Sequence, residues 1–259
     1  MTACTYQDLH NFALFSPEEG GSLLRWKYRG VDILSPDHTA IVGNESKKRG
    51  GMPLCFPFGT TDPRYDLPKH GLLRHTPASV TRIDGVIIAS PNLFGPRKAS
   101  WCRVETRMRS EPNGLSFVLS VLLLDEPLEP IYANAGLHPY FRLPEGRMRV
   151  TIAGKSKEDE PAAKHVYQNL PDAETFDNHG RAEVVIPGLG TVTMTTIGNA
   201  WKRAARPRFV LWTDNVREYA CVEPVLGMGS DYGTSACPRL KVGETLSIGC
   251  RFEVELGKF

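Results

Sequence analysis

Short stretches in which apolar and polar residues alternate recur along most of this chain, and turn-forming residues separate them. A period of two is typical of β-strands, and no long segment keeps the 3.6-residue apolar period of a helix. The pattern therefore predicts a chain rich in β-structure with little helix. The predicted strands are residues 11–16, 22–28, 31–34, 80–83, 86–89, 101–109, 115–124, 182–186, 191–197, 209–213, 219–222 and 246–256.

Turn signals indicate that neighbouring strands pair in antiparallel order. Asp84-Gly85 joins two short runs with a sequence typical of a two-residue hairpin, and Asn113-Gly114 lies between two long runs. This many strands, without a detectable repeat or linker, predict an all-β fold: one large β-sandwich domain over residues 1–259. Residues 50–68 and 155–164 are expected to form long loops on this scaffold.

Composition and charge narrow the classes of partner. The 259 residues are 41% hydrophobic and 23% charged, and the formal net charge is +2. These proportions are typical of globular proteins, and the balanced charge favours neither nucleic acid nor a membrane as the partner. No apolar run approaches the roughly 20 residues that span a bilayer. A small polar ligand remains open.

The N-terminus and the cysteines indicate a reducing compartment. The first ten residues lack the basic segment followed by an apolar segment that marks a signal peptide, so a cytoplasmic location is expected. Six cysteines are scattered without Cys-x-x-Cys spacing, which favours reduced thiols over disulfides or a zinc site. His70 and His75 also lack the spacing of a helical zinc pair, so no metal is expected.

One region is rich in residues that restrict the backbone. Residues 49–59 read RGGMPLCFPFG, and residues 69–74 read KHGLLR. Glycine and proline hold such a backbone in defined conformations, so we expect a rigid loop that gathers several cationic or titratable side chains. This candidate pocket wall contains Arg49, Lys69, His70 and Arg74.

Two later segments contain groups suited to acid–base chemistry. His138 lies in the sequence GLHPYF, and Glu223 lies in the apolar sequence CVEPV. An imidazole and a carboxylate that face each other across a gap the size of a sugar would suit proton transfer near neutral pH. A lone histidine is more often structural, and strand alternation alone can place a glutamate on a solvated face. Burying Glu223, however, is costly unless the carboxylate is paired or used.

Taken in order, these segments resemble the motifs of the aldose 1-epimerase superfamily, and most closely its hexose-6-phosphate 1-epimerase-like branch. The motifs are RGGMP at 49–53, KHGLLR at 69–74, LHPYF at 137–141 and VEP at 222–224. The resemblance implies a large twisted antiparallel β-sandwich, the galactose mutarotase-like supersandwich. It also implies interconversion of the α and β anomers of an aldose by ring opening and reclosure, without a cofactor.

The resemblance also implies roles for individual residues. His138 would be the general acid at the ring oxygen, Glu223 the general base at the C1 hydroxyl, and His70 would support the ring-oxygen side. Arg49 and Arg74 occupy positions where the phosphate-sugar branch holds its anionic group. The residue before His70 is Lys69, whereas the family more commonly has glutamine there, and the lysine adds positive charge to the expected pocket. The aspartate that contacts the sugar matches Asp177 best, with Asp172 second.

Several alternatives stay open from the sequence. The anionic substituent could be a phosphate or the sulfonate of sulfoquinovose, and a neutral hexose is a third possibility. A protein that binds or senses a carbohydrate without turning it over would keep the same fold. The sequence shows neither the oligomeric state, monomer or homodimer, nor the pathway.

Overall fold

The structure, a computed structural model, describes residues 3–42, 45–57, 68, 70–83, 86–94, 100–126, 130–152, 155–158, 174–214 and 218–257. Strands dominate these residues, and their only helical elements are the 3₁₀ turns η1 (Pro17–Glu19), η2 (Leu73–His75), η3 (Ala200–Lys202) and η4 (Gly229–Asp231). Nothing in this described part forms a helix of the length and apolar character that crossing a membrane requires. The predicted scarcity of helix is confirmed.

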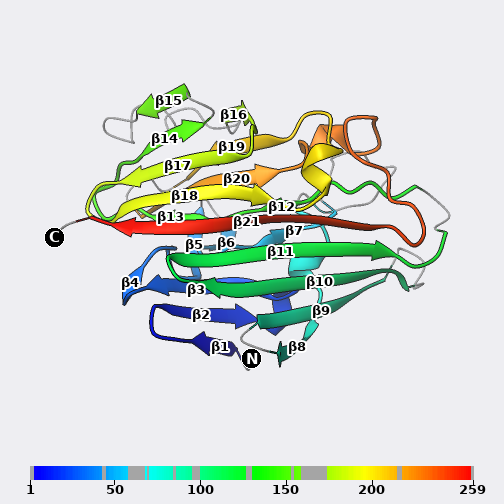
Figure 1. Cartoon of the computed structure of the whole chain (residues 1–259), viewed down its shortest axis with the longest axis horizontal. Coiled ribbons are helices and arrows are strands. Elements are labelled where there is room, and N and C mark those ends of the chain that lie inside the picture. Colours follow the sequence, from blue (N-terminus) through cyan, green and yellow to red (C-terminus); the bar gives the residue numbers. More distant parts are fainter. Residues whose placement is uncertain are drawn as a thin grey trace.

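The largest sheet has nine strands and forms one layer of the molecule (Figure 1). Its strand order is β15-β14-β17-β18-β21-β11-β10-β9-β8, and the neighbours pair antiparallel. The strands are β8 (Ala78–Ile83), β9 (Val86–Phe94), β10 (Ser100–Glu111), β11 (Gly114–Leu123), β14 (Arg149–Ile152), β15 (Lys155–Glu158), β17 (Arg181–Ile186), β18 (Gly190–Ile197) and β21 (Thr245–Leu256).

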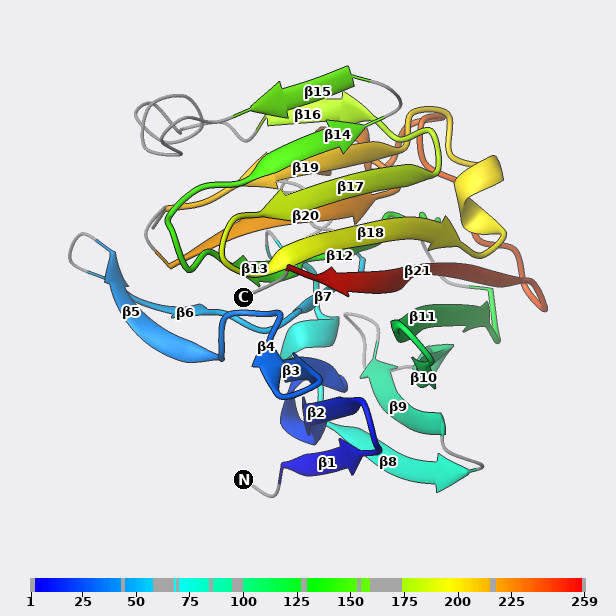
Figure 2. The same ribbon diagram turned by 60° about the vertical axis from the view of Figure 1, so that its left-hand side comes forward.

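A second sheet of six strands forms the other layer. Its order is β16-β19-β20-β12-β7, and β13 also pairs with β20. The strands are β7 (Leu54–Cys55), β12 (Gly136–Leu137), β13 (Tyr140–Arg142), β16 (Glu174–Asp177), β19 (Arg208–Trp212) and β20 (Tyr219–Val225). Figure 2 shows β16, β19 and β20 stacked against β14, β17 and β18, as expected for two sheets that bury a common core.

Two smaller sheets complete the described part of the chain. A four-stranded meander has the order β1 (Cys4–Gln7), β2 (Asn11–Ser16), β3 (Ser22–Tyr28) and β4 (Val31–Asp32). A separate hairpin pairs β5 (His38–Val42) with β6 (Glu45–Arg49), and this hairpin delivers Arg49 at its end. The large antiparallel β-sandwich expected from the sequence is confirmed.

Alternation along β19 and β20 separates the core from the face that holds the candidate site. Successive side chains of a strand point to opposite faces. One set belongs to the main cluster of buried hydrophobic residues, which also contains Phe117 of β11. This set consists of Phe209, Leu211, Ala220 and Val222. The other set lies in a small separate cluster, in which Trp212 packs against Tyr140, Tyr219 and Cys221. The six-stranded sheet thus buries one face in the core and presents the other to the site.

Some predicted boundaries were wrong in ways that tertiary pairing explains. Residues 155–158 were expected in a loop, but they form β15, because backbone hydrogen bonds to β14 stabilise an edge strand without apolar alternation. The predicted strand at 31–34 is limited to Val31–Asp32, and the one at 219–222 continues to Val225. The remainder of the expected loop, residues 159–164, lies outside the described residues.

Candidate active site

Strand register brings His138 and Glu223 to the same face of the six-stranded sheet. Cys221 and Glu223 are two residues apart on β20 and so point to the same side. Tyr140 on β13 is the register partner of Cys221, and His138 lies two residues before Tyr140. His138 Nε2 is 3.4 Å from Glu223 Oε1, and the two side chains are only 6% and 7% exposed. The two groups therefore touch directly, closer than the sugar-sized gap expected from the sequence.

Three aromatic side chains contact the imidazole of His138. Tyr140 stacks on it with ring centroids 4.7 Å apart and an interplanar angle of 8°. Trp212 meets it edge-on at 5.8 Å, and His70 does so at 5.6 Å. The Nδ1 atom is buried and has no hydrogen-bond partner among the described residues. These contacts fix the ring plane and leave Nε2, on the side of Glu223, as the atom that can exchange a proton.

The surroundings of His138 disfavour its charged form. Burial is the main cause that lowers its pKa well below the usual value, and the nearby His70, Arg74 and Arg49 lower this pKa further. The neutral imidazole is therefore the favoured form of His138 at neutral pH.

This lowered pKa makes stability depend on pH with a defined sign. The unfolded chain protonates the histidine near pH 6.5, whereas the folded chain does so only at lower pH, so the free energy of unfolding falls as pH drops below about 6.5. We expect His138→Gln to reduce this loss by up to about 1.4 kcal/mol for each pH unit below 6.5. Denaturant unfolding at pH 7.5 and 5.5 measures the loss of unfolding free energy between these two pH values in each variant. His179→Gln, at an exposed position, controls for removing a histidine, and equal slopes in both variants would contradict the assignment.

The glycine-rich segment is tied to the site by backbone hydrogen bonds. Gly51 has a φ of +66°, and its carbonyl oxygen accepts a 2.9 Å hydrogen bond from the Tyr140 amide. The amide of His138 donates to the carbonyl oxygen of Pro53 at 3.1 Å. A backbone that only glycine adopts readily thus holds the histidine segment in place, as the rigid loop predicted from the sequence requires.

Gly71 holds a second part of this wall in position. Its φ is +77°, and a Cβ atom added to it would lie 2.2 Å from the carbonyl oxygen of Pro57. Such a distance leaves no room for a side chain, so glycine alone lets the segment after His70 pass against the backbone of residues 56–57. His70, the residue before this glycine, meets the imidazole of His138 edge-on.

Arg49 takes part in an ion-pair network at the edge of the site. Its guanidinium donates to both carboxylate oxygens of Asp214, with Nε 3.2 Å from Oδ1 and 3.0 Å from Oδ2, and the Tyr219 hydroxyl donates to the same carboxylate. It also lies 5.2 Å from the ring centroid of Trp212, a cation–π distance. Burial lowers the pKa of Arg49, but the hydrogen bonds to Asp214 and the electrostatic interactions with Asp214, Tyr140 and Tyr219 together outweigh it and raise that pKa above the usual value. The charge of Arg49 is therefore balanced within the protein.

The other predicted binding residues are placed differently. Arg74, in η2, is half-buried, and its charge helps to lower the pKa of His138. The same charge offsets part of the rise that burial causes in the pKa of Cys55. Asp177 lies on the edge strand β16, with β19 between it and β20, and its 67% exposed side chain pairs with Arg208. Lys69 and Asp172 lie outside the described residues.

Sequence reasoning assigned no role to two side chains that lie beside the pair and its neighbours, Asp214 and Cys221. The donor atoms of His138, Cys221 and Glu223 all lie within 4.8 Å of one another. The i, i+2 spacing of Cys221 and Glu223 within one strand was a usable signal, because it places both side chains on one face. Asp214 carried no local signal, since its partner Arg49 is 165 positions away in the chain.

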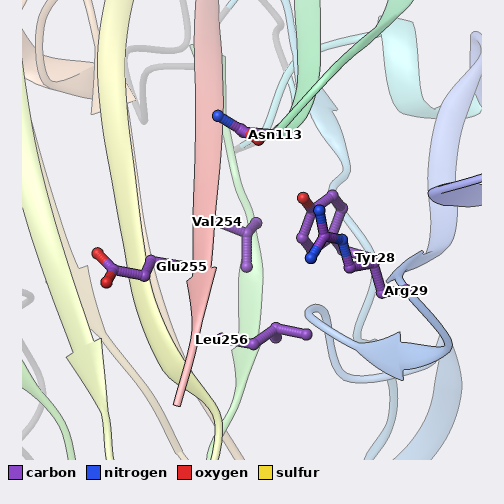
Figure 3. A pocket seen from close by; sticks show the side chains of 6 residues that line it. All are labelled: Tyr28, Arg29, Asn113, Val254, Glu255 and Leu256. Carbon is purple, nitrogen blue, oxygen red and sulfur yellow. The ribbon is translucent and has the colours of Figure 1, made fainter. Parts of the chain in front are cut away.

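A separate cavity lies away from these residues, where the β3–β4 turn meets the end of β21 (Figure 3). It has a volume of about 370 Å³, and its lining residues are Tyr28, Arg29, Asn113, Val254, Glu255 and Leu256. The Arg29 guanidinium lies over the Tyr28 ring, and the Glu255 carboxylate points away from both (Figure 3). None of the predicted site residues lines this cavity.

The overall architecture matches solved structures along nearly the whole chain. A candidate aldose 1-epimerase from Escherichia coli K12 superimposes with a TM-score of 0.72 at 16% identity, covering 98% of this chain and 99% of that one. A galactose mutarotase-like protein from Lactobacillus casei ATCC 334 gives 0.69 at 14% identity, with 98% and 100% coverage. A galactose mutarotase-like protein from Clostridium acetobutylicum gives 0.66 at 17% identity, with 98% and 95% coverage.

The sequence comparisons add no closer relative. No protein-family model matches the chain, and no curated protein sequence does. At identities of 14–17%, the structural likeness establishes the fold alone: the chain has the galactose mutarotase-like β-sandwich.

Proposed function

We propose that this chain is an isomerase that interconverts the α and β anomers of an aldose by opening and reclosing the sugar ring. The observation that carries the proposal is the buried contact between His138 and Glu223, 3.4 Å apart on one face of the sheet. The fold supports it, because structures of the same fold are described as mutarotase-like proteins or candidate aldose 1-epimerases. We extend the proposal to residues 1–259 as one domain, since β-strands from both ends of the chain contribute to the main core.

The short separation of the two groups suits this reaction. Ring opening requires a proton to arrive at the ring oxygen while another leaves the C1 hydroxyl, and both oxygens are bonded to the same carbon. An acid and a base that serve the two oxygens must therefore lie close together. In the proposed roles, His138 protonates the ring oxygen and Glu223 removes the hydroxyl proton.

Proton and electron balance follow directly from this pair. The pair reacts from the form in which His138 carries the proton, which the lowered pKa of His138 makes the minor form at neutral pH. This imidazolium gives its proton to the ring oxygen as the bond between C1 and the ring oxygen breaks and its electron pair moves to that oxygen. Glu223 takes the hydroxyl proton, and the C1 carbonyl forms. After rotation about the C1–C2 bond, the reverse transfers close the ring on the other face of the carbonyl. The pair holds one proton before and after opening, so no cofactor and no exchange with solvent are required.

Aromatic side chains supply a surface for the sugar ring. Trp212 is half-buried, and its indole meets the His138 imidazole edge-on. The Arg49 guanidinium lies over the same indole at a cation–π distance. Sugars place their apolar C–H surface on such rings. We therefore assign Trp212 to sugar binding, with Asp214 and Arg49 positioning it. Asp177 lies opposite Arg208, at the other end of β19 from Trp212.

Exchange NMR on the purified chain tests the proposal. We expect faster α–β exchange of at least one sugar among glucose 6-phosphate, sulfoquinovose, galactose and glucose, relative to the spontaneous reaction in the same buffer. If no sugar exchanges faster while calorimetry still detects sugar binding, the chain is a carbohydrate-binding protein and the proposed reaction is wrong.

We propose an aldose with an anionic substituent, phosphate or sulfonate, as the preferred substrate. Arg74 contributes positive charge close to the acid–base pair, and both Arg74 and His70 lower the pKa of His138. Guanidinium groups suit phosphate and sulfonate oxygens because they donate several hydrogen bonds. Arg49 contributes less to this charge than the sequence indicated, because Asp214 balances it.

Replacing Arg74 separates anionic from neutral substrates. We expect Arg74→Gln to raise KM for glucose 6-phosphate about tenfold or more, in line with the loss of a charge-assisted hydrogen bond of about 1.5–3 kcal/mol. The KM for galactose should change little. Arg251→Gln, an exposed arginine on β21, is the matched control. Equal losses on both sugars would exclude Arg74 from recognition of the anionic group.

A further inference from the structure

Three different metal-ligand groups meet in the buried part of the site. They are the imidazole of His138, the thiol of Cys221 and the carboxylate of Glu223, all buried, with ligand atoms within 4.8 Å of one another. The acid–base reaction proposed above uses the imidazole and the carboxylate and gives the thiol no role. Cys221 is therefore a buried nucleophilic group that the mechanism leaves unexplained.

The spacing of two of these ligands already matches a tetrahedral metal site. Bonds of 2.0–2.2 Å from zinc to nitrogen and oxygen place two ligand atoms about 3.4 Å apart across a tetrahedral angle. The measured separation of His138 Nε2 and Glu223 Oε1 is 3.4 Å. A separation of 3.4 Å is long for a hydrogen bond between nitrogen and oxygen, but it is the distance expected between two ligand atoms of one tetrahedral metal ion.

The chemistry of the three donors selects a class of metal. Thiolate favours zinc and other thiophilic ions over magnesium or calcium, and imidazole suits the same ions. One Cys, one His and one Glu supply three protein ligands. Zinc sites whose fourth position is open to water or substrate also have three protein ligands. The set lacks the run of carboxylates and carbonyls that a hard cation needs.

We propose that His138, Cys221 and Glu223 form a three-ligand site for a zinc-like divalent cation, whose fourth ligand comes from outside the chain. Binding displaces the thiol proton to solvent and leaves Cys221 as a thiolate ligand. A metal held there occupies Nε2 of His138 and a carboxylate oxygen of Glu223, the two atoms that the proposed reaction needs for proton transfer. The metal-bound chain is then unable to interconvert anomers, so zinc acts as an inhibitor of the proposed activity.

Cobalt(II) provides a spectroscopic probe of this site that does not depend on activity. Titration of the purified full chain with Co²⁺ should produce a near-ultraviolet thiolate-to-cobalt charge-transfer band and visible bands of the intensity typical of four-coordinate cobalt. Added Zn²⁺ should remove these bands, because zinc binds such sites more tightly than cobalt. The absence of a charge-transfer band at saturating Co²⁺ would overturn the proposal.

Matched variants identify the ligands. Cys221→Ala should abolish the charge-transfer band, whereas Cys250→Ala, which deletes another fully buried thiol, should keep it. Glu223→Gln preserves the shape of the side chain but removes a charged ligand. Loss of a group that only hydrogen-bonds to a metal ligand weakens metal binding about 10- to 100-fold, and we expect Glu223→Gln to weaken Co²⁺ binding by more than this. Far-ultraviolet circular dichroism checks that each variant folds. A band that survives Cys221→Ala in a folded chain would assign the metal elsewhere.

The metal site and the proposed reaction fail separately. A chain that shows the cobalt bands but accelerates no sugar exchange retains the metal site and loses the epimerase assignment. A chain that accelerates exchange but shows no cobalt bands, and is not inhibited by Zn²⁺, retains the reaction and loses the metal site.

Discussion

A Glu223→Gln variant is expected to lose about 100- to 10,000-fold in kcat while it still binds the sugar, because an amide cannot accept the C1 hydroxyl proton. The change keeps the shape of the side chain and removes its basicity. Since the Glu223 side chain is 7% exposed and its Oε1 lies 3.4 Å from Nε2 of His138, the variant also removes the negative charge that stabilises the imidazolium needed at the ring oxygen. Both effects act on the transition state, so kcat should fall far more than KM rises. Exchange NMR at saturating sugar measures the rate, and calorimetry measures the binding.

The control for this variant is a carboxylate outside the site. Glu253→Gln changes an exposed glutamate on β21 and should leave the exchange rate within about twofold of the unmodified chain, as for most surface substitutions. Undiminished turnover in Glu223→Gln would remove Glu223 from its proposed role. Loss of binding together with turnover would show that the carboxylate holds the sugar rather than the proton.

The second large effect is expected on stability, in the wall that positions His70. Gly71→Ala combines a positive φ, which costs an alanine about 1–2 kcal/mol, with a Cβ atom 2.2 Å from the carbonyl oxygen of Pro57. Relieving such a clash costs about a further 1–3 kcal/mol, so we expect the free energy of unfolding to fall by about 2–5 kcal/mol. The measurement is denaturant unfolding, with sugar exchange as a second reading, because any shift of this backbone displaces His70.

The chain offers a closely matched control for this substitution. Gly243 has a φ of +76°, against +77° for Gly71, but nothing lies within 4 Å of an added Cβ atom. Gly243→Ala should therefore cost only the conformational part, about 1–2 kcal/mol. If the two alanine variants lose equal stability, the close approach of Gly71 to residues 56–57 contributes nothing.

The prediction of individual elements depended on their length. Long strands such as β11 and β21 carry their signal over ten or more residues, β21 as alternation and β11 as a nearly continuous apolar run, so the sequence was enough to find them. The short strands β7 and β12 have two residues each and no period of their own, and they form because neighbouring strands offer backbone partners. The same reason explains why a charged segment became β15.

The prediction of site residues depended on the range of their interactions. Glycines 51 and 71 were identified as constraints because a positive φ is a local demand on the residue type. His138 and Glu223 were proposed from their motifs, and the structure places them in direct contact rather than across the expected sugar-sized gap. The pairing of Arg49 with Asp214 was not foreseen, and it changes a cation expected to hold the substrate into one whose charge is balanced inside the protein.

The sequence by itself determined the β-rich architecture and the constrained glycine loop, and it proposed His138 and Glu223 as the acid and the base, because alternation, turn chemistry and side-chain reactivity are properties of neighbouring residues. Only the tertiary structure decided that the imidazole and the carboxylate touch, that Cys221 lies beside them, and that Asp214 balances Arg49. These facts follow from strand register between segments far apart in the chain. A shift of one residue in that register would turn each of these side chains to the opposite face of the sheet.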